Sequence, residues 1–400
     1  MKKSTSLLAT CILLSPVTFS QPGTLDSTFG GDGTVKTNIA IGGAFAFSAV
    51  LQADEKIVLE GHTLLKDKLI IARLKTDGSL DSSFGLNGAA VYDSLRYNES
   101  HNALALQTDG KIVLATNRGS VDFAVIRFLQ NGTLDSSFGS NGRAAIKLEG
   151  DNTSSAVAIQ PDGKIVVAGS AIVNNYWHGF ALARYNANGT IDSSFGSNGI
   201  SRELTGDCDG FGKAVAIQPD GKIVLAGYTS CVSNPHPVIL RYNSHGHLDS
   251  SFSGTGKIVA NLDYALGYAV AIQKDGKIVV GGDINIYGNE GLLLRYLQNG
   301  ELDSSFGTNG ETHSLIGNNY NNRFESFALQ VNGAIVVLAT SADGFRPHDF
   351  GLIRFLPGGQ VDLSFGTNGT VLTDIQNAKT MLPRSVQSGK TGKSLRWEDL

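Results

Sequence analysis

Short apolar runs alternate with glycine-containing turns along most of the chain. In AVAIQPDGKIVVAG, at residues 156–169, two apolar runs flank Pro-Asp-Gly. Glycine accepts the positive φ that tight turns between antiparallel strands require, so this pattern predicts a β-hairpin. Both runs are apolar at nearly every position, which is typical of strands that are covered on two faces.

The hairpin pattern recurs throughout the chain. After each hairpin come a further apolar strand ending in Arg and then Leu-Asp-x-Ser-Phe or a close variant, and successive motif aspartates are 54 to 59 residues apart. Recurrence at such a period indicates an array of similar structural units. The motif aspartates are Asp26, Asp81, Asp135, Asp192, Asp249, Asp303 and Asp362, and the arginines, each eight residues before a motif aspartate, are Arg73, Arg127, Arg184, Arg241, Arg295 and Arg354.

Each unit is predicted to contain four strands, which we name a to d. Strand a follows Asn-Gly (143–148), strands b and c form the hairpin, and strand d ends in Arg-aromatic (180–185). A four-stranded meander with two apolar faces must stack on copies of itself, and a radial array of such sheets is a β-propeller. A solenoid is the alternative, but solenoid repeats are usually shorter. We therefore predict an all-β propeller of four-stranded antiparallel blades, six of them complete, with residues 370–375 as one strand of a truncated seventh. The alternative is a closed six-bladed ring in which residues 370–375 compete for the place of residues 34–39.

The constant segment from Arg through Asp to Asn-Gly is predicted to cross from the outer strand d of one blade to the inner strand a of the next. Its Asp can accept backbone N–H bonds in a tight turn, its Phe can fill the gap between blades, and its glycines permit the bends. A Ca²⁺ site at each crossover is the alternative. Because the motif offers a single carboxylate, the structural role is favoured and no metal is predicted.

The segments LDSSFGSNG, AIQPDGKIVVAG and ALARYN resemble the delta-60 repeat of bacterial secreted and surface proteins. The resemblance covers nearly all of residues 24–375, with local departures at 253–256 and 332–334. It implies a propeller. It implies little about activity, because the family is defined by its repeat and brings no shared catalytic or binding residues.

The N-terminus has the pattern of a signal peptide at residues 1–20. Lys2 and Lys3 precede a short apolar run, and Thr18-Phe19-Ser20 is a small-x-small cleavage site. The propeller is then predicted to span 21–375 in a secreted, periplasmic or cell-surface protein. A lipoprotein signal ending at Cys11 is a weaker alternative. No other apolar stretch is long enough to predict a transmembrane segment.

The charge of the predicted propeller excludes two classes of partner. Without the signal and the residues after 375, it has 25 basic and 34 acidic residues, a net charge of −9. Such a body repels nucleic acid and anionic lipid.

Candidate binding residues lie in the predicted a–b and c–d loops. These loops share one face of the ring and differ in every copy, so we call it the variable face; the b–c turns and d–a connections share the constant face. Aromatic and amide side chains there suit a carbohydrate or a surface protein, although such residues also simply populate loops. The candidates are Tyr97, His101, Tyr176, Trp177, His178, Tyr264, Tyr287, Tyr320 and Arg323.

Cys208 and Cys231 are predicted to lie in the a–b and c–d loops of one blade. Once the signal is removed they are the only thiols. In an oxidising compartment we predict a disulfide between them.

Enzyme signatures are absent from the sequence. The eight histidines form no metal-binding spacing, and there is no Gly-x-Ser-x-Gly motif. We predict a non-catalytic binding or surface-interaction module that needs no cofactor. The alternative is a propeller hydrolase acting on carbohydrate or a lactone-like ester.

The tail at residues 376–400 contains GKTGKS, which superficially resembles a phosphate-binding loop. The spacing fails, because residue 387 is Gln where the first Gly should be. Reading the codons one base early permits AI-x-KDGKIV-x-VGG, close to residues 271–282. We therefore predict an unstructured tail that is the out-of-frame remnant of a seventh blade.

Overall fold

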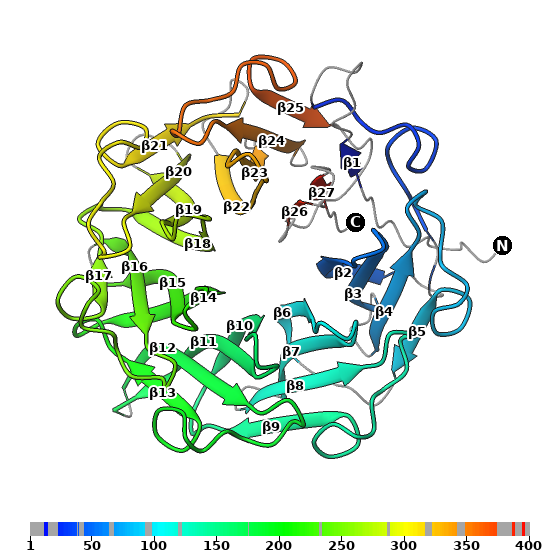
Figure 1. Cartoon of the computed structure of the whole chain (residues 1–400), viewed down its shortest axis with the longest axis horizontal. Coiled ribbons are helices and arrows are strands. Elements are labelled where there is room, and N and C mark those ends of the chain that lie inside the picture. Colours follow the sequence, from blue (N-terminus) through cyan, green and yellow to red (C-terminus); the bar gives the residue numbers. More distant parts are fainter. Residues whose placement is uncertain are drawn as a thin grey trace.

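Six antiparallel sheets of four strands each are arranged radially about one axis (Figure 1). The computed structural model describes residues 12–14, 23–37, 39, 44–63, 68–92, 98–118, 122–174, 176–231, 234–285, 289–316, 322–341, 349–373, 386–388 and 394–396. Within these residues the predicted all-β propeller with four-stranded blades is confirmed. The blades are β2–β5, β6–β9, β10–β13, β14–β17, β18–β21 and β22–β25, which we number 1 to 6.

Every blade has the strand order b-c-d-a from the axis outward. The b strands are β2 (Ala44–Leu51), β6 (Asn98–Leu106), β10 (Thr153–Ile159), β14 (Asp209–Ile217), β18 (Ala265–Ile272) and β22 (Asn322–Leu329). The c strands are β3 (Ile57–Thr63), β7 (Ile112–Arg118), β11 (Ile165–Val173), β15 (Ile223–Ser230), β19 (Ile278–Asn285) and β23 (Ile335–Ser341). The d strands are β4 (Leu69–Leu74), β8 (Asp122–Phe128), β12 (Trp177–Tyr185), β16 (Pro235–Tyr242), β20 (Asn289–Tyr296) and β24 (Asp349–Phe355). The a strands are β5 (Ala89–Tyr92), β9 (Arg143–Lys147), β13 (Ile200–Glu203), β17 (Lys257–Val259), β21 (Glu311–Ser314) and β25 (Thr370–Thr373).

The predicted place of strand a was wrong. Strand a is the outermost strand of the same blade and pairs with strand d, for example Leu182 with Ser201. The connection cannot cross to the next blade because it folds back on its own Arg: Arg184 N–H donates to Gly199 O, and Asp192 N–H donates to Arg184 O. Residues 370–373 are therefore the outer strand of blade 6 and not a strand of a seventh blade.

The repeated polar residues hold each connection together and tie it to the next blade. In all six blades Arg Nε donates to Asp Oδ2 across 2.7–2.9 Å. The other oxygen of Asp192 accepts from the backbone and hydroxyl of Ser194. Arg184 also donates to Ser244 O of blade 4 and lies over the buried Phe195 ring, 4.4 Å from its centroid. The predicted structural role of the motif is confirmed.

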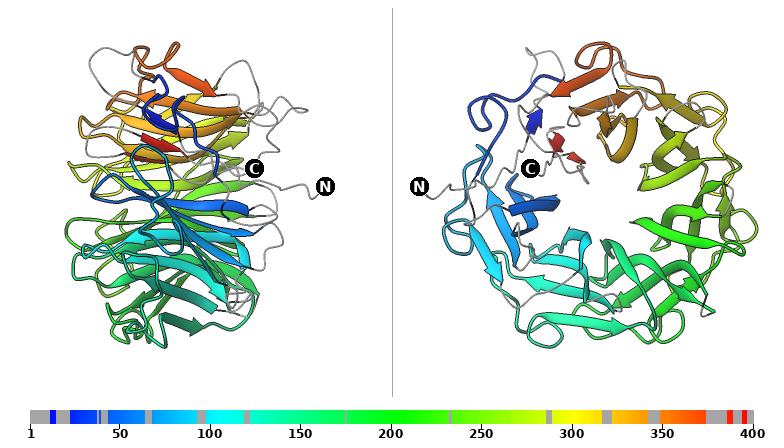
Figure 2. Two further views of the ribbon diagram at one scale, coloured as in Figure 1. Left: turned by 90° about the vertical axis from the view of Figure 1, so that its right-hand side faces the viewer. Right: turned by 180° about the vertical axis from the view of Figure 1, so that it is seen from behind.

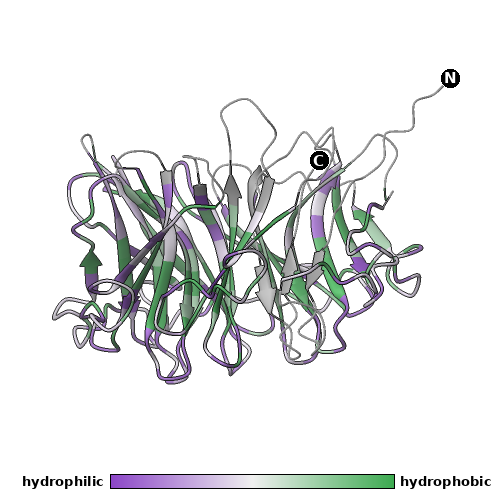
Figure 3. Cartoon of the chain, turned by 90° about the horizontal axis from the view of Figure 1, so that it is seen from above, coloured by the Kyte–Doolittle hydropathy of each residue, from purple (hydrophilic) through white to green (hydrophobic). Residues whose placement is uncertain are grey.

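Apolar side chains of neighbouring blades form shared cores. One such cluster joins Val166 and Leu182 of blade 3 to Leu225 and Val238 of blade 4, all fully buried. Figure 3 shows the strands running between the two faces, with apolar residues concentrated inside the blades and polar ones at the loops. Burial between blades explains why strands b and c are apolar on both faces.

Three further strands form a small sheet between blades 6 and 1. They are β1 (Ile12–Leu14), β27 (Ser394–Arg396) and β26 (Val386–Ser388), paired antiparallel in that order (Figure 2). The described residues contain no helix that is long and apolar enough to cross a membrane.

Candidate binding site

One position in strand c decides what each blade presents near the variable face. It is the sixth residue of the strand, and in blades 2 to 5 its side chain contacts strand b of the following blade. Two small polar residues at this position accept backbone hydrogen bonds from that strand: Asn117 Oδ1 from Ser154 N–H (2.7 Å) and Ser170 Oγ from Gly212 N–H (3.1 Å). The six residues at this position are His62, Asn117, Ser170, Tyr228, Asp283 and Thr340.

Strand b contributes through a β-bulge in the same region. Its register with strand c shifts by one residue, and the extra, bulged residue is Lys213 in blade 4, Tyr268 in blade 5 and Glu325 in blade 6. A bulge bends the strand and re-aims the extra side chain. The bulge residues thus come beside the sixth residues of strand c from the preceding blades.

These positions bring six side chains of blades 4 to 6 together, which we call the tyrosine–arginine cluster. Arg323 is at its centre: Nε donates to Asp283 Oδ2 (3.1 Å) and Nη2 donates to the Tyr268 hydroxyl (2.6 Å). Its guanidinium lies 5.0 Å from the centroid of the Tyr268 ring. The cluster consists of Phe211, Lys213, Tyr228, Tyr268, Asp283 and Arg323.

Aromatic contacts extend the cluster across the blade interface. Tyr228 meets Tyr268 edge to face at 6.0 Å and Phe211 at 5.4 Å, and Lys213 Nζ lies within 6 Å of the Phe211 and Tyr228 ring centroids. The two tyrosines can meet because the strands approach closely beside them: a Cβ on Gly267 would be 2.7 Å from Gly227 O.

Burial sets the charge behaviour of the cluster. It raises the pKa of the Asp283 carboxyl to about 6, although Arg323 and Tyr268 favour the ionised form. Burial likewise raises the pKa values of Tyr228 and Tyr268, so both hydroxyls stay protonated at neutral pH. The pKa of Arg323 is also raised: burial opposes this shift, but Glu325, Tyr268 and Asp283 outweigh it.

A second carboxylate lies close to the first. Glu325 Oε1 is 3.7 Å from Arg323 Nε, the same nitrogen that binds Asp283. The Asp283 and Glu325 side chains are 6% and 13% exposed, whereas Arg323 is 36% exposed. The Arg323 side chain is therefore the exposed charge of the cluster, and the two acids beside it are shielded.

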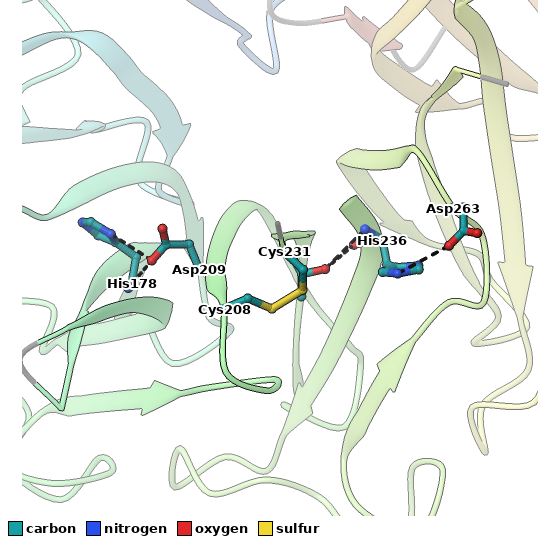
Figure 4. The surroundings of a disulfide bond; sticks show 7 residues. His178, Cys208, Asp209, Cys231, His236 and Asp263 are labelled. Atoms are coloured by element: carbon teal, nitrogen blue, oxygen red, sulfur yellow. Dashed lines mark hydrogen bonds and ion pairs between the residues drawn. A yellow bond between two sulfur atoms is a disulfide. The ribbon is translucent and has the colours of Figure 1, made fainter. Parts of the chain in front are cut away.

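A disulfide and a histidine border the cluster. Figure 4 shows the surroundings of this disulfide. Cys208 and Cys231 are bonded, with Cα atoms 5.0 Å apart, and they join the segment before Phe211 to the segment after Tyr228. The adjacent Asp209 accepts a hydrogen bond from the backbone N–H of His178 (2.8 Å). The His178 ring stacks on Phe211 at 6.1 Å, so blade 3 adds a further ring to the site.

The predicted candidates divide into three groups. His178 and Arg323 lie at the tyrosine–arginine cluster. Tyr176 (83% exposed) lies between β11 and β12, the half-buried Trp177 is the first residue of β12, and Tyr264 (51% exposed) lies just before β18. Tyr97, Tyr287 and Tyr320 are outside the described residues, and the His101 side chain is not described.

Sequence reasoning missed Phe211, Lys213, Tyr228, Tyr268 and Asp283. The binding residues were predicted in the loops, whereas these five residues belong to the strands just inside the variable face. A signal was available: Tyr and Asp replace the small Asn, Ser or Thr found at the sixth position of strand c in three other blades. Among the described residues, no group of three or more His, Cys, Asp or Glu is placed to hold a metal ion.

Five segments of the chain match a sequence family described as a domain of unknown function (DUF5122) beta-propeller. They are residues 52–84, 107–138, 160–195, 218–252 and 273–306. Each runs from the b–c turn to the motif Phe, or nearly so, in blades 1 to 5. The family agrees with the predicted kind of repeat, while the delta-60 name remains a prediction. No curated protein was found to match the chain.

Several solved structures are distantly similar to the chain. A protein of unknown function from Bacteroides caccae is 13% identical over 75% of this chain and 93% of its own, with a TM-score of 0.43. Polysaccharide lyase Uly1 is 7% identical over 88% and 89%, with a TM-score of 0.47. A glucose dehydrogenase is 12% identical over 75% and 96%, with a TM-score of 0.44. Similarities this low assign no activity to this chain.

Proposed function

We propose that this chain is a non-catalytic, carbohydrate-binding propeller whose ligand lies on the tyrosine–arginine cluster. The observation that carries the proposal is the convergence of Tyr228, Tyr268 and Arg323 from three consecutive blades. A rigid scaffold that presents variable residues at one end of its axis is a common arrangement for specific binding.

The chemistry of the cluster suits a sugar. Flat aromatic rings pack against the apolar C–H face of a pyranose, and a fixed guanidinium donates to adjacent hydroxyls. Arg323 is already oriented by Asp283 and Tyr268, so little ordering is needed on binding. Because Asp283 and Glu325 lie beside Arg323 and Lys213, the cluster has no large excess of either sign, which favours a neutral saccharide.

A glycan array followed by calorimetry on the best ligand tests the proposal. Tyr228→Ala and Arg323→Ala should each weaken binding at least tenfold, about 1.4 kcal/mol. The control is Tyr92→Phe, which removes an equally specific hydrogen bond, from Tyr92 Oη to Gly132 O (2.7 Å), on the outer strand β5. That variant should bind as the unmodified protein does. A protein that binds no glycan, or binds one equally well in all variants, would contradict the proposal.

The alternative is a carbohydrate hydrolase, and one observation favours it. Asp283 and Glu325 are paired shielded carboxylates, and burial raises the pKa of Asp283 to about 6, as a general acid requires. Incubation with the bound glycan and measurement of new reducing ends separates the two functions. We expect no turnover; turnover that disappears in Asp283→Asn would establish the hydrolase instead.

The proposal includes secretion and a lost blade. We propose that residues 1–20 are removed and that the protein acts in the periplasm or at the cell surface, where a carbohydrate or a surface protein would be its partner. We further propose that residues 376–400 are the out-of-frame remnant of a seventh blade. The nucleotide sequence tests this: codons that cannot encode Asp-Gly-Lys when read one base early would exclude it.

A further inference from the structure

The segment at residues 23–37 contacts blade 1 in the way that each d–a connection contacts the following blade. At five successive interfaces the residue after the motif Phe donates its N–H to a carbonyl of the next blade, over 2.7–2.8 Å: Gly85 to Asn131, Gly139 to Asn188, Gly196 to His245, Ser253 to Asn299 and Gly307 to Gly358. Gly30 N–H donates to Asp77 O of blade 1 over 2.9 Å. Phe29, fully buried, packs with Ile57 and Leu59 of blade 1. Residues 23–37 therefore make the contacts with blade 1 that the d–a connection of a preceding blade would make.

The same segment follows blade 6 in the way that one blade follows another. A Cβ on Gly23 would lie 2.7 Å from Gly366 N. A Cβ on the equivalent Gly359 or Gly189 would lie 2.8 Å from Gly307 N or 2.7 Å from Gly139 N. Leu25 packs on a core cluster of blade 6 that contains Phe365. The segment thus contacts blade 6 on one side and blade 1 on the other, as the d–a connection of an additional blade between them would.

The inner part of this position is filled by the two chain ends. β26 lies innermost, near β22 and β2, and is followed outward by β27 and β1 (Figures 1 and 2). Five residues, 389–393, separate β26 from β27, as five residues separate strand b from strand c in each of the six blades. β26 and β27 therefore have the place, the antiparallel pairing and the separation in sequence of strands b and c.

We infer that the ring has seven sectors and that the seventh is a composite blade. β26 and β27 supply strands b and c, and residues 23–37, the N-terminal clasp, supply the d–a connection. In the precursor β1 supplies strand d. After the proposed removal of residues 1–20, the clasp, β26 and β27 remain, and the outer edge of β27 loses its partner.

The composite blade is the weakest part of the ring, because its sequence does not suit its position. The six b–c hairpins carry Ile, Val, Leu and Ala, whereas β26 and β27 read Val-Gln-Ser and Ser-Leu-Arg. Polar strands cannot bury apolar area against blades 6 and 1. Restoring the apolar pattern should therefore strengthen closure.

The test replaces residues 386–396 with the sequence of residues 270–280 from blade 5, VAIQKDGKIVV, in the full chain. The melting temperature should rise by about 5 °C. Amides of the clasp, Gly30 above all, should exchange more slowly with solvent. A variant with the same eleven residues in scrambled order is the control and should show neither effect.

Two further variants separate closure of the seventh sector from general stabilisation. Phe29→Ala in the clasp should abolish the gain from the replacement. Phe84→Ala, the equivalent change between blades 1 and 2, should lower the melting temperature but leave the gain intact. An unchanged melting temperature with unchanged exchange in residues 23–37 would overturn the inference, and so would a gain that survives Phe29→Ala.

Discussion

Asp283 shows how a single repeat position acquires new chemistry. Where blade 3 has Ser170, which accepts one backbone hydrogen bond, blade 5 has a carboxylate that binds Arg323. Burial raises the pKa of Asp283 to about 6, above the value near 4 of an unfolded chain. The folded state therefore holds this proton more tightly than the unfolded state, and the stabilisation from this group is present below pH 4 and lost as the pH rises through 6.

The free energy of unfolding of Asp283→Asn can be compared with that of the unmodified protein at each pH. The other titrating groups are common to both proteins, so their contributions cancel in the difference. We expect that difference to change by roughly 3 kcal/mol between pH 4 and pH 7, with the variant gaining as pH rises, in urea unfolding measured at each pH. The control is Asp263→Asn, at an aspartate whose side chain is 61% exposed. If the free energies of unfolding of Asp283→Asn and the unmodified protein differed by the same amount at every pH, the pKa shift would be contradicted.

At the scale of elements, the disulfide braces the hairpin that carries half of the tyrosine–arginine cluster. Cys208 and Cys231, 23 residues apart, join the start of β14 to the end of β15. Closing a loop of that length stabilises a protein by about 3 kcal/mol in the chain-entropy account. Changing both cysteines to Ser should lower the free energy of unfolding by about that amount, and thiol titration of the denatured, unreduced protein should find no free thiol at either position. Reduction of the unmodified protein is the matched control, because it should reproduce the stability of the double variant. A thiol count of two without reductant would show that the bond does not form in solution.

The elements that sequence predicted correctly are those with local causes. The b–c hairpins follow from Asp-Gly turns, and the role of the Arg–Asp–Phe motif follows from the number of groups it can bond. Strand a was misplaced because the 14 residues between Tyr185 and Ile200 are enough either to cross to the next blade or to fold back. Only the hydrogen bonds of Arg184 and Gly199 distinguish the two paths. The cluster was missed for a similar reason: a bulge at Tyr268 has no sequence signature, and it decides which side chains meet.

At the scale of the whole molecule, an Arg–Asp pair holds each of the six d–a connections, and five of these arginines also donate to a carbonyl of the next blade, which makes the ring sensitive to acid. Burial opposes ionisation of Asp249, but hydrogen bonds from Ser251 and the cations Arg241 and Lys222 outweigh it and hold the pKa at about 2. Because the pKa is lower in the folded state, the stabilisation is complete above pH 4 and is lost as the pH falls from 4 towards 2.

Asp249→Asn should lower the free energy of unfolding at pH 7 by roughly 3 kcal/mol, since Arg241 is left buried without its partner. That deficit should shrink as the pH is lowered to 3, because residue 249 then becomes protonated in the unfolded state of the unmodified protein, which lowers the stability of that protein and not of the variant. Asp220→Asn is the control: this carboxylate contacts the same Lys222 but is 53% exposed, so its removal should cost less than about 1 kcal/mol at any pH. Urea unfolding from pH 7 to 3 measures both, and a deficit for Asp249→Asn that is independent of pH would show that the motif acts through packing and not through charge.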